Sequence, residues 1–258
     1  MKKMKYIFSL LVVAAASQWT SAQEFKVAVE NNKEAKLTLV NLTGDLPIEG
    51  YSGNEIIVTV THGHFDTPEK AKGLKPVYGG GVDNTGMAIA MEKNGNSVTL
   101  TCLLSFGHDV GYKLRVPENI ALKIDRDCPR GGETNISGIK NEIELKSCQE
   151  VNLKNVSGPL VINTISGGIN VVFTDISKDK PISLAAISGD VDVTMPAKSA
   201  VDLELSTMAG SMYSDFDLSA TYKDMHRVGG GNIKTQLNGG GTSLKLRAIS
   251  GNIYLRKG

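Results

Sequence analysis

The sequence has few aromatic residues and no excess of charge of either sign. Phe, Trp and Tyr make up 5% of its 258 residues, so a core filled with large rings is not expected. Lys and Arg number 28 against 27 Asp and Glu, a net charge of +1, which argues against a nucleic-acid-binding protein. After residue 22, no stretch approaches about 18 uninterrupted apolar residues, so no transmembrane segment is expected there.

Residues 1–22 have the pattern of a secretory signal peptide. Lys2, Lys3 and Lys5 precede an apolar run over residues 6–16, and the small residues Ser21 and Ala22 end the segment. This order predicts cleavage after Ala22 and export to the periplasm, the cell surface or the extracellular space. An ordinary buried N-terminal helix is the alternative.

The chain after the signal peptide alternates between apolar and polar residues, which is typical of β-strands. The pattern covers residues 25–29, 37–42, 55–60 and 97–101, and no convincing helix is found. Residues 62–96 are less regular and predict an insertion with a short helical turn around residues 68–72. We therefore predict an all-β protein with an N-terminal β region over residues 23–120.

An internal repeat occupies the second half of the chain. An apolar residue followed by Ser-Gly, or a similar pair, recurs with glycines at positions 138, 158, 167, 189, 210, 230 and 251. The separations are 20, 9, 22, 21, 20 and 21 residues, which predicts a single-stranded β-solenoid over residues 121–258, continuous with the N-terminal part, with coils of about 20 to 22 residues. Glycine suits such corners because it reaches positive φ. A sandwich of hairpins is the alternative.

Three segments resemble the bacterial family known as the "putative adhesin domain", found in secreted and envelope proteins. They are Gly44–Gly50 with the following Ile56–Val58, Tyr112–Pro117, and the turn at Ile187–Val191. The resemblance implies a right-handed β-solenoid capped by a less regular N-terminal part. The function of this family is largely unassigned, and it brings no catalytic motif and no cofactor.

The three cysteines are Cys102, Cys128 and Cys148. Cys128 and Cys148 each lie ten residues before a repeat glycine, at Gly138 and Gly158, so they occupy equivalent positions on neighbouring coils. Neighbouring strands lie about 4.8 Å apart, within the Cα range of a disulfide. We predict a Cys128–Cys148 disulfide, with stacked free thiols as the alternative, and a buried Cys102.

The segment 61–66 contains the only candidate metal ligands, His62, His64 and Asp66. In one strand, alternate residues project from the same face, which is a plausible ligand geometry. The motif resembles the His-x-His-x-Asp motif of metallo-β-lactamase-fold hydrolases over six residues only. A solvated polar strand end is the preferred interpretation, so no metal and no cofactor are expected.

Function is less evident than architecture. Serines fall in turns, and no nucleophile motif or phosphate-binding loop is found. We predict a non-catalytic, adhesin-like binding protein that presents a rigid repetitive surface to a polysaccharide or to an envelope or host protein. Five aromatic residues are candidate sugar-stacking platforms: Phe106, Tyr112, Tyr213, Tyr222 and Tyr254.

Two alternative functions stay open. The first is a carbohydrate-active enzyme on a solenoid, with Asp190 and Asp192 as outward carboxylates and Arg126 and Arg130 one repeat region earlier. The second is a purely structural component of the periplasmic envelope.

Overall fold

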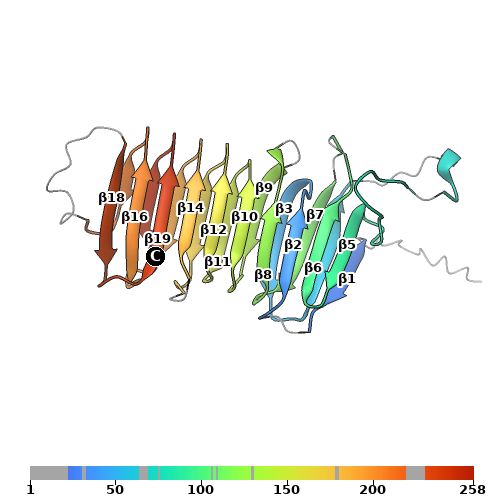
Figure 1. Cartoon of the computed structure of the whole chain (residues 1–258), viewed down its shortest axis with the longest axis horizontal. Coiled ribbons are helices and arrows are strands. Elements are labelled where there is room, and N and C mark those ends of the chain that lie inside the picture. Colours follow the sequence, from blue (N-terminus) through green and yellow to red (C-terminus); the bar gives the residue numbers. More distant parts are fainter. Residues whose placement is uncertain are drawn as a thin grey trace, which may run out of the picture.

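The computed structural model describes residues 23–258 except 31–32, 64–68, 75, 106, 109, 129–130, 178–179 and 219–229. The described residues form two sheets of ten strands each and no α-helix, which confirms the all-β prediction (Figure 1). A 3-10 turn at Glu69–Ala71 (η1) is the helical turn expected in the insertion.

Sheet A and sheet B lie face to face and enclose the core. The strands of sheet A, in spatial order, are β1 (Glu24–Ala28), β4 (Glu55–His62), β7 (Gly111–Pro117), β3 (Gly44–Tyr51), β9 (Gly131–Ser137), β11 (Val151–Val156), β13 (Ile169–Phe173), β15 (Val191–Met195), β20 (Ile253–Lys257) and β17 (Met212–Ser214). The strands of sheet B are β18 (Gly231–Leu237), β16 (Val201–Thr207), β19 (Thr242–Ala248), β14 (Ile182–Ala186), β12 (Leu160–Thr164), β10 (Ile143–Ser147), β8 (Ala121–Asp125), β2 (Lys36–Val40), β6 (Ser97–Cys102) and β5 (Ile89–Asn94).

In the middle of the molecule, consecutive strands alternate between the two sheets, and each strand pairs in parallel with the equivalent strand of the next coil. Leu145 of β10 pairs with Ile162 of β12, and Ile162 pairs with Leu184 of β14. All three side chains are buried, because alternate residues of each strand point into the space between the sheets. Parallel pairing excludes a sandwich built from hairpins here, and stacked aliphatic residues take the place of large rings.

The Ser-Gly turns lie at both corners of the coil, which explains the nine-residue step in the repeat. The corner at residues 157–159 leads from sheet A to sheet B, whereas the corner at residues 165–168 leads back to sheet A. One strand and one corner separate Gly158 from Gly167. The sequence repeat therefore mixes two kinds of corner.

Four glycines stack at the corner that leads from sheet B to sheet A: Gly167, Gly189, Gly251 and Gly210. None of them has a positive φ, so the expected conformational reason for glycine is wrong at these positions. A Cβ on Gly189 would lie within 3.0 Å of the Gly167 backbone, and a Cβ on Gly251 would come equally close to Gly189. Glycine is needed because successive coils approach without room for a side chain.

The C-terminal coil does not lie at the end of the stack. Strands β19 and β20 are inserted between the coil of β14 and β15 and the later coil that contains β16 and β17 (Figure 1). The chain thus leaves a gap of one coil after β15 and returns to fill it. The regular repeat suggests that the coils stack in sequence order, and this expectation is wrong at the C-terminal end of the chain.

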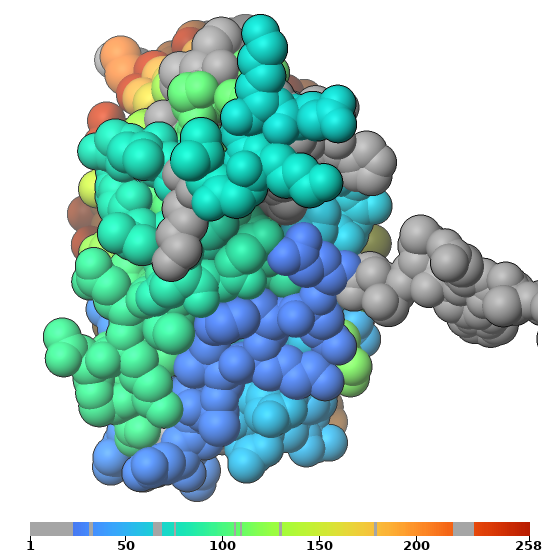
Figure 2. Space-filling view, turned by 90° about the vertical axis from the view of Figure 1, so that its right-hand side faces the viewer, coloured from blue at the N-terminus to red at the C-terminus, as the bar shows by residue number. Residues whose placement is uncertain are grey.

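Antiparallel strands close three of the four sheet ends. Strand β1 pairs with β4, β5 with β6, and β18 with β16, all antiparallel. Figure 2 looks onto the end that carries β1 and β5, and residues of the N-terminal β region, coloured blue to green, cover this end of the stack. Sheet A ends at its other side with β17, a strand of three residues.

Candidate binding face on sheet A

One row of outward side chains crosses the second half of sheet A. Strand pairing aligns its members in the order Asn135, Asn152, Asn170, Asp192, Tyr254 and Tyr213. We call this set the sheet A row. Because strands lie about 4.8 Å apart, the row presents one polar or aromatic group at each strand spacing.

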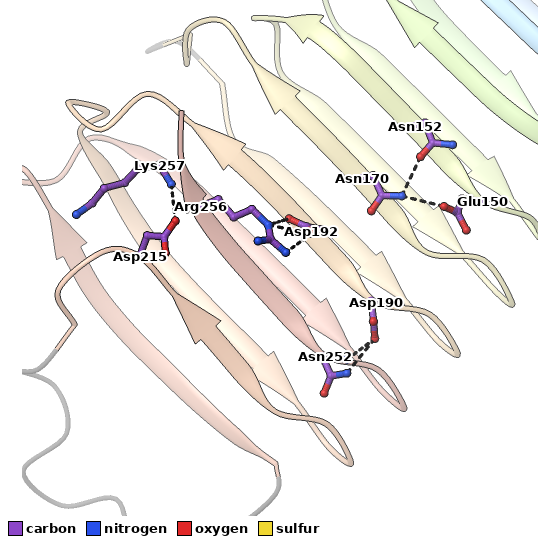
Figure 3. A network of polar contacts seen from close by, with 9 residues as sticks. All are labelled: Glu150, Asn152, Asn170, Asp190, Asp192, Asp215, Asn252, Arg256 and Lys257. Carbon is purple, nitrogen blue, oxygen red and sulfur yellow. Dashed lines mark hydrogen bonds and ion pairs between the residues drawn. The ribbon is translucent and has the colours of Figure 1, made fainter.

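The asparagines of the row form a hydrogen-bonded ladder. Figure 3 shows two of them, Asn152 and Asn170. Asn152 Nδ2 donates to Asn135 Oδ1 at 3.1 Å, and Asn170 Nδ2 donates to Asn152 Oδ1 at 2.8 Å. Asn170 Nδ2 also donates to Glu150 Oε1 at 2.9 Å. These bonds hold each amide in one orientation, so the groups left for a ligand are fixed in advance.

Arg256, on the neighbouring strand β20, binds the carboxylate of Asp192. Arg256 Nε donates to Asp192 Oδ1 and Nη2 to Asp192 Oδ2, both at 2.8 Å. The hydrogen bonds to Asp192 raise the pKa of the Arg256 guanidinium. The guanidinium carbon also lies 5.4 Å from the centroid of the Tyr254 ring, within the range of a cation–π interaction.

Two tyrosines end the row. The rings of Tyr213 and Tyr254 stack with their centroids 5.3 Å apart and an interplanar angle of 11°. Tyr213 is 55% exposed and belongs to β17, the last strand of sheet A. The pair therefore offers an aromatic surface beside a fixed carboxylate and guanidinium.

Figure 3 also shows two further polar pairs near the C-terminal end of the row. Asp190 accepts a hydrogen bond from the backbone N–H of Asn252 at 2.7 Å, which ties two corners together. Asp215 accepts from the backbone N–H of Lys257 at 3.4 Å.

The structure brings together some of the residues expected from sequence and separates others. Tyr213 and Tyr254 meet, but Tyr112 is fully buried, with its hydroxyl donating to the Met87 carbonyl at 2.8 Å. Phe106, Tyr222 and Arg130 lie outside the described residues. The asparagine ladder was missed, although Asn135, Asn152 and Asn170 each occupy an outward position of an alternating strand.

Arg126 does not join the carboxylates Asp190 and Asp192. It is 3% exposed, and its guanidinium donates to the carbonyls of Leu42, Gly44 and Gly132 and to Thr134 Oγ1. Burial lowers its pKa to about 10. Arg126 thus binds the backbone at a corner, and its coil is three strands away from β15 in sheet A.

The candidate metal ligands are only partly described. His62 is exposed at the end of β4, where its ring lies over Gly111, and the next residue, Gly63, has a φ of 100°. His64 and Asp66 lie outside the described residues. Within the described ranges, no group of three or more His, Cys, Asp or Glu side chains could hold a metal ion.

The structure contains a Cys128–Cys148 disulfide, with the two Cα atoms 4.9 Å apart. It joins the corner after β8 to the corner after β10. Cys102 is buried outside this disulfide, at the end of β6.

Two facing parallel sheets, stacked corners and an outward row of polar groups define a β-solenoid. Residues 131–256 match the model of the Toastrack DUF4097 family. This match confirms the resemblance to the putative adhesin domain family.

Solved structures that match the chain include a putative cell adhesion protein from Clostridium sporogenes and a putative adhesin from Bacteroides fragilis. The first is 12% identical with a TM-score of 0.47, and the alignment covers 92% of this chain and 100% of that one. The second is 12% identical with a TM-score of 0.38, covering 92% and 97%. No curated protein matches the chain. In the described part of the chain, no helix is long and apolar enough to cross a membrane.

Proposed function

We propose that the protein is an exported, non-catalytic adhesin-like protein whose sheet A row binds a polysaccharide. The observation that carries this proposal is the stacked pair Tyr213–Tyr254 beside the Asp192–Arg256 ion pair. Sugar rings present C–H faces that pack on aromatic rings, while their hydroxyl groups need fixed donors and acceptors. The row supplies both kinds of contact side by side.

The regular spacing of the row supports a polymer over a single sugar. Asn135, Asn152 and Asn170 repeat with the strand spacing, so a chain laid along the solenoid meets the same amide group at each step. Repeated weak contacts along one polymer add up through multivalency. Acidic and basic side chains are mixed near the tyrosines, which favours a neutral polysaccharide.

The proposal is tested by a polysaccharide array probed with the purified protein and with Tyr213→Ala. One stacked ring contributes about 1 kcal/mol beyond its buried area, and the lost buried area adds to this, so the substitution is expected to weaken binding by about tenfold. Val172→Ala is the matched control, because Val172 is 39% exposed on the same sheet but outside the row. Binding that is absent from the wild type, or equal in all three proteins, would contradict the proposal.

Export rests on the signal-peptide pattern, and the disulfide is consistent with an oxidising compartment. Protease accessibility on intact and permeabilised cells distinguishes the cell surface from the periplasm. Cleavage on intact cells is expected for a surface adhesin. Cleavage only after permeabilisation would favour a structural role in the periplasm.

A carbohydrate-active enzyme is the alternative, and two contacts count against it. Asp192 is bound by Arg256, and Asp190 is bound by Asn252, so neither carboxylate is poised as a general acid or base. Polysaccharide turnover by the purified protein, lost on Asp190→Ala, would support the enzyme instead.

A further inference from the structure

A groove with a volume of about 450 Å³ lies on the outer face of sheet B, on the side of the molecule away from the sheet A row. Outward residues of neighbouring strands form its floor, which runs from Lys146 through Asn163 and Ala185 to Arg247. Asn163 and Ala185 are short side chains between two long ones, which is why the surface is hollow here. The four strands span three spacings, or about 14 Å.

A ridge of isoleucines, two of them exposed and one half-buried, forms one wall of the groove. Ile165, Ile187 and Ile249 occupy the same corner position on successive coils, because Ser188 N donates to Ile165 O and Ser250 N to Ile187 O, both at 2.9 Å. Ile165 and Ile187 are each 46% exposed, whereas the inward aliphatic residues of the preceding strands β12 and β14 are buried. A contiguous exposed apolar ridge of this kind is typical of a binding site.

The charges around the groove are unequally distributed. Arg247 is exposed at one end, and no hydrogen bond or ion pair engages it within the described residues. The carboxylates that line the groove, Asp125 and Asp127, lie at the other end, near Lys146 and the disulfide. Asp127 already accepts a hydrogen bond from Asn41 Nδ2 at 2.8 Å. The Arg247 end is therefore positively charged and open to an anion.

We propose that this groove binds a free, single-chain anionic amphiphile, with its anionic head at Arg247 and its alkyl chain along the isoleucine ridge. An alkyl chain has no polar groups to satisfy along its length, so an apolar wall suits it. An extended peptide would bring backbone N–H and C=O groups against strands whose own backbone groups are already paired, and burying them unpaired is costly. Volumes of this size are ordinary for small-molecule sites.

Calorimetric titration of dodecanoate into the full-length mature protein tests the inference. We expect saturable one-to-one binding that Ile187→Ser weakens by about tenfold, because a buried aliphatic contact is lost. Arg247→Gln should weaken dodecanoate binding and leave dodecanol binding unchanged. Val161→Ser is the matched control, since Val161 is 38% exposed on the same sheet, in another row.

Three results would overturn this inference. They are no saturable binding of dodecanoate by the wild type, an equal loss in Val161→Ser and Ile187→Ser, and binding only to phosphatidylglycerol vesicles. Ile187 and Val161 are exposed, so both substitutions should leave the fold intact, and circular dichroism of each variant checks this. The groove and the sheet A row lie on opposite sheets, so failure of polysaccharide binding leaves this test unaffected.

Discussion

Replacement of Gly189 by alanine is expected to destabilise the solenoid through a clash between coils. The added Cβ would lie within 3.0 Å of three backbone atoms of Gly167 and Gly168, and backbone cannot rotate away as a side chain can. Gly251 stacks on the other side of Gly189, so a shift in either direction disturbs a second coil. Overpacking in a close-packed region costs about 1–3 kcal/mol, and we expect the upper end of that range.

Urea denaturation followed by circular dichroism measures this cost. With a denaturant slope of about 3 kcal/mol/M, a loss of about 3 kcal/mol lowers the midpoint by about 1 M. Gly79→Ala is the control, because a Cβ at Gly79 meets no atom within 4 Å and Gly79 has no positive φ. This control should be neutral or slightly stabilising. A Gly189→Ala midpoint equal to that of wild type would refute the close-approach argument.

Two further predictions concern the disulfide and the buried tyrosine. Reduction of the Cys128–Cys148 disulfide, which spans 20 residues, should add two hydrogens to the intact mass and cost about 3 kcal/mol of stability by loop entropy; peptide mapping that assigns the bridge elsewhere would contradict the register. Burial raises the pKa of Tyr112 above its ordinary 10.0. As the pH rises, the unfolded chain therefore loses the Tyr112 proton before the folded protein does. The free energy of unfolding should be unaffected by this group below pH 10 and should fall as the pH rises further. Tyr112→Phe should flatten this alkaline loss and cost about 1 kcal/mol at pH 7 for the hydrogen bond to Met87; an unchanged alkaline slope in urea denaturation would count against it.

The local pattern of the chain predicted strands and stacking but could not predict the order of the coils. Alternation in segments such as residues 191–195 gives the inward face directly, and the equivalent positions of Cys128 and Cys148 gave the disulfide partners. The insertion of β19 and β20 beside β15 depends on which free sheet edge the last coil pairs with. Similar repeats offer similar edges, so the repeat alone does not choose between them.

The candidate binding face depends on this same insertion. The sequence marks Tyr213 and Tyr254 as candidate platforms without placing them together, and they stack because β20 pairs with β17. The Asp192–Arg256 ion pair likewise forms because β20 lies beside β15. A stack that followed sequence order would place β20 beyond β17, away from Asp192. The sequence therefore points to the two tyrosines and Asp192 as candidates, but it does not predict that they lie side by side.

Hydrogen–deuterium exchange with and without a polysaccharide selected from the array tests the central claim most directly. Exchange should slow in β17 and β20 when the polysaccharide is bound, with no change in the sheet B strands β12 and β14. Protection confined to sheet B, or no protection in either sheet at saturating polysaccharide, would contradict a binding face on the sheet A row.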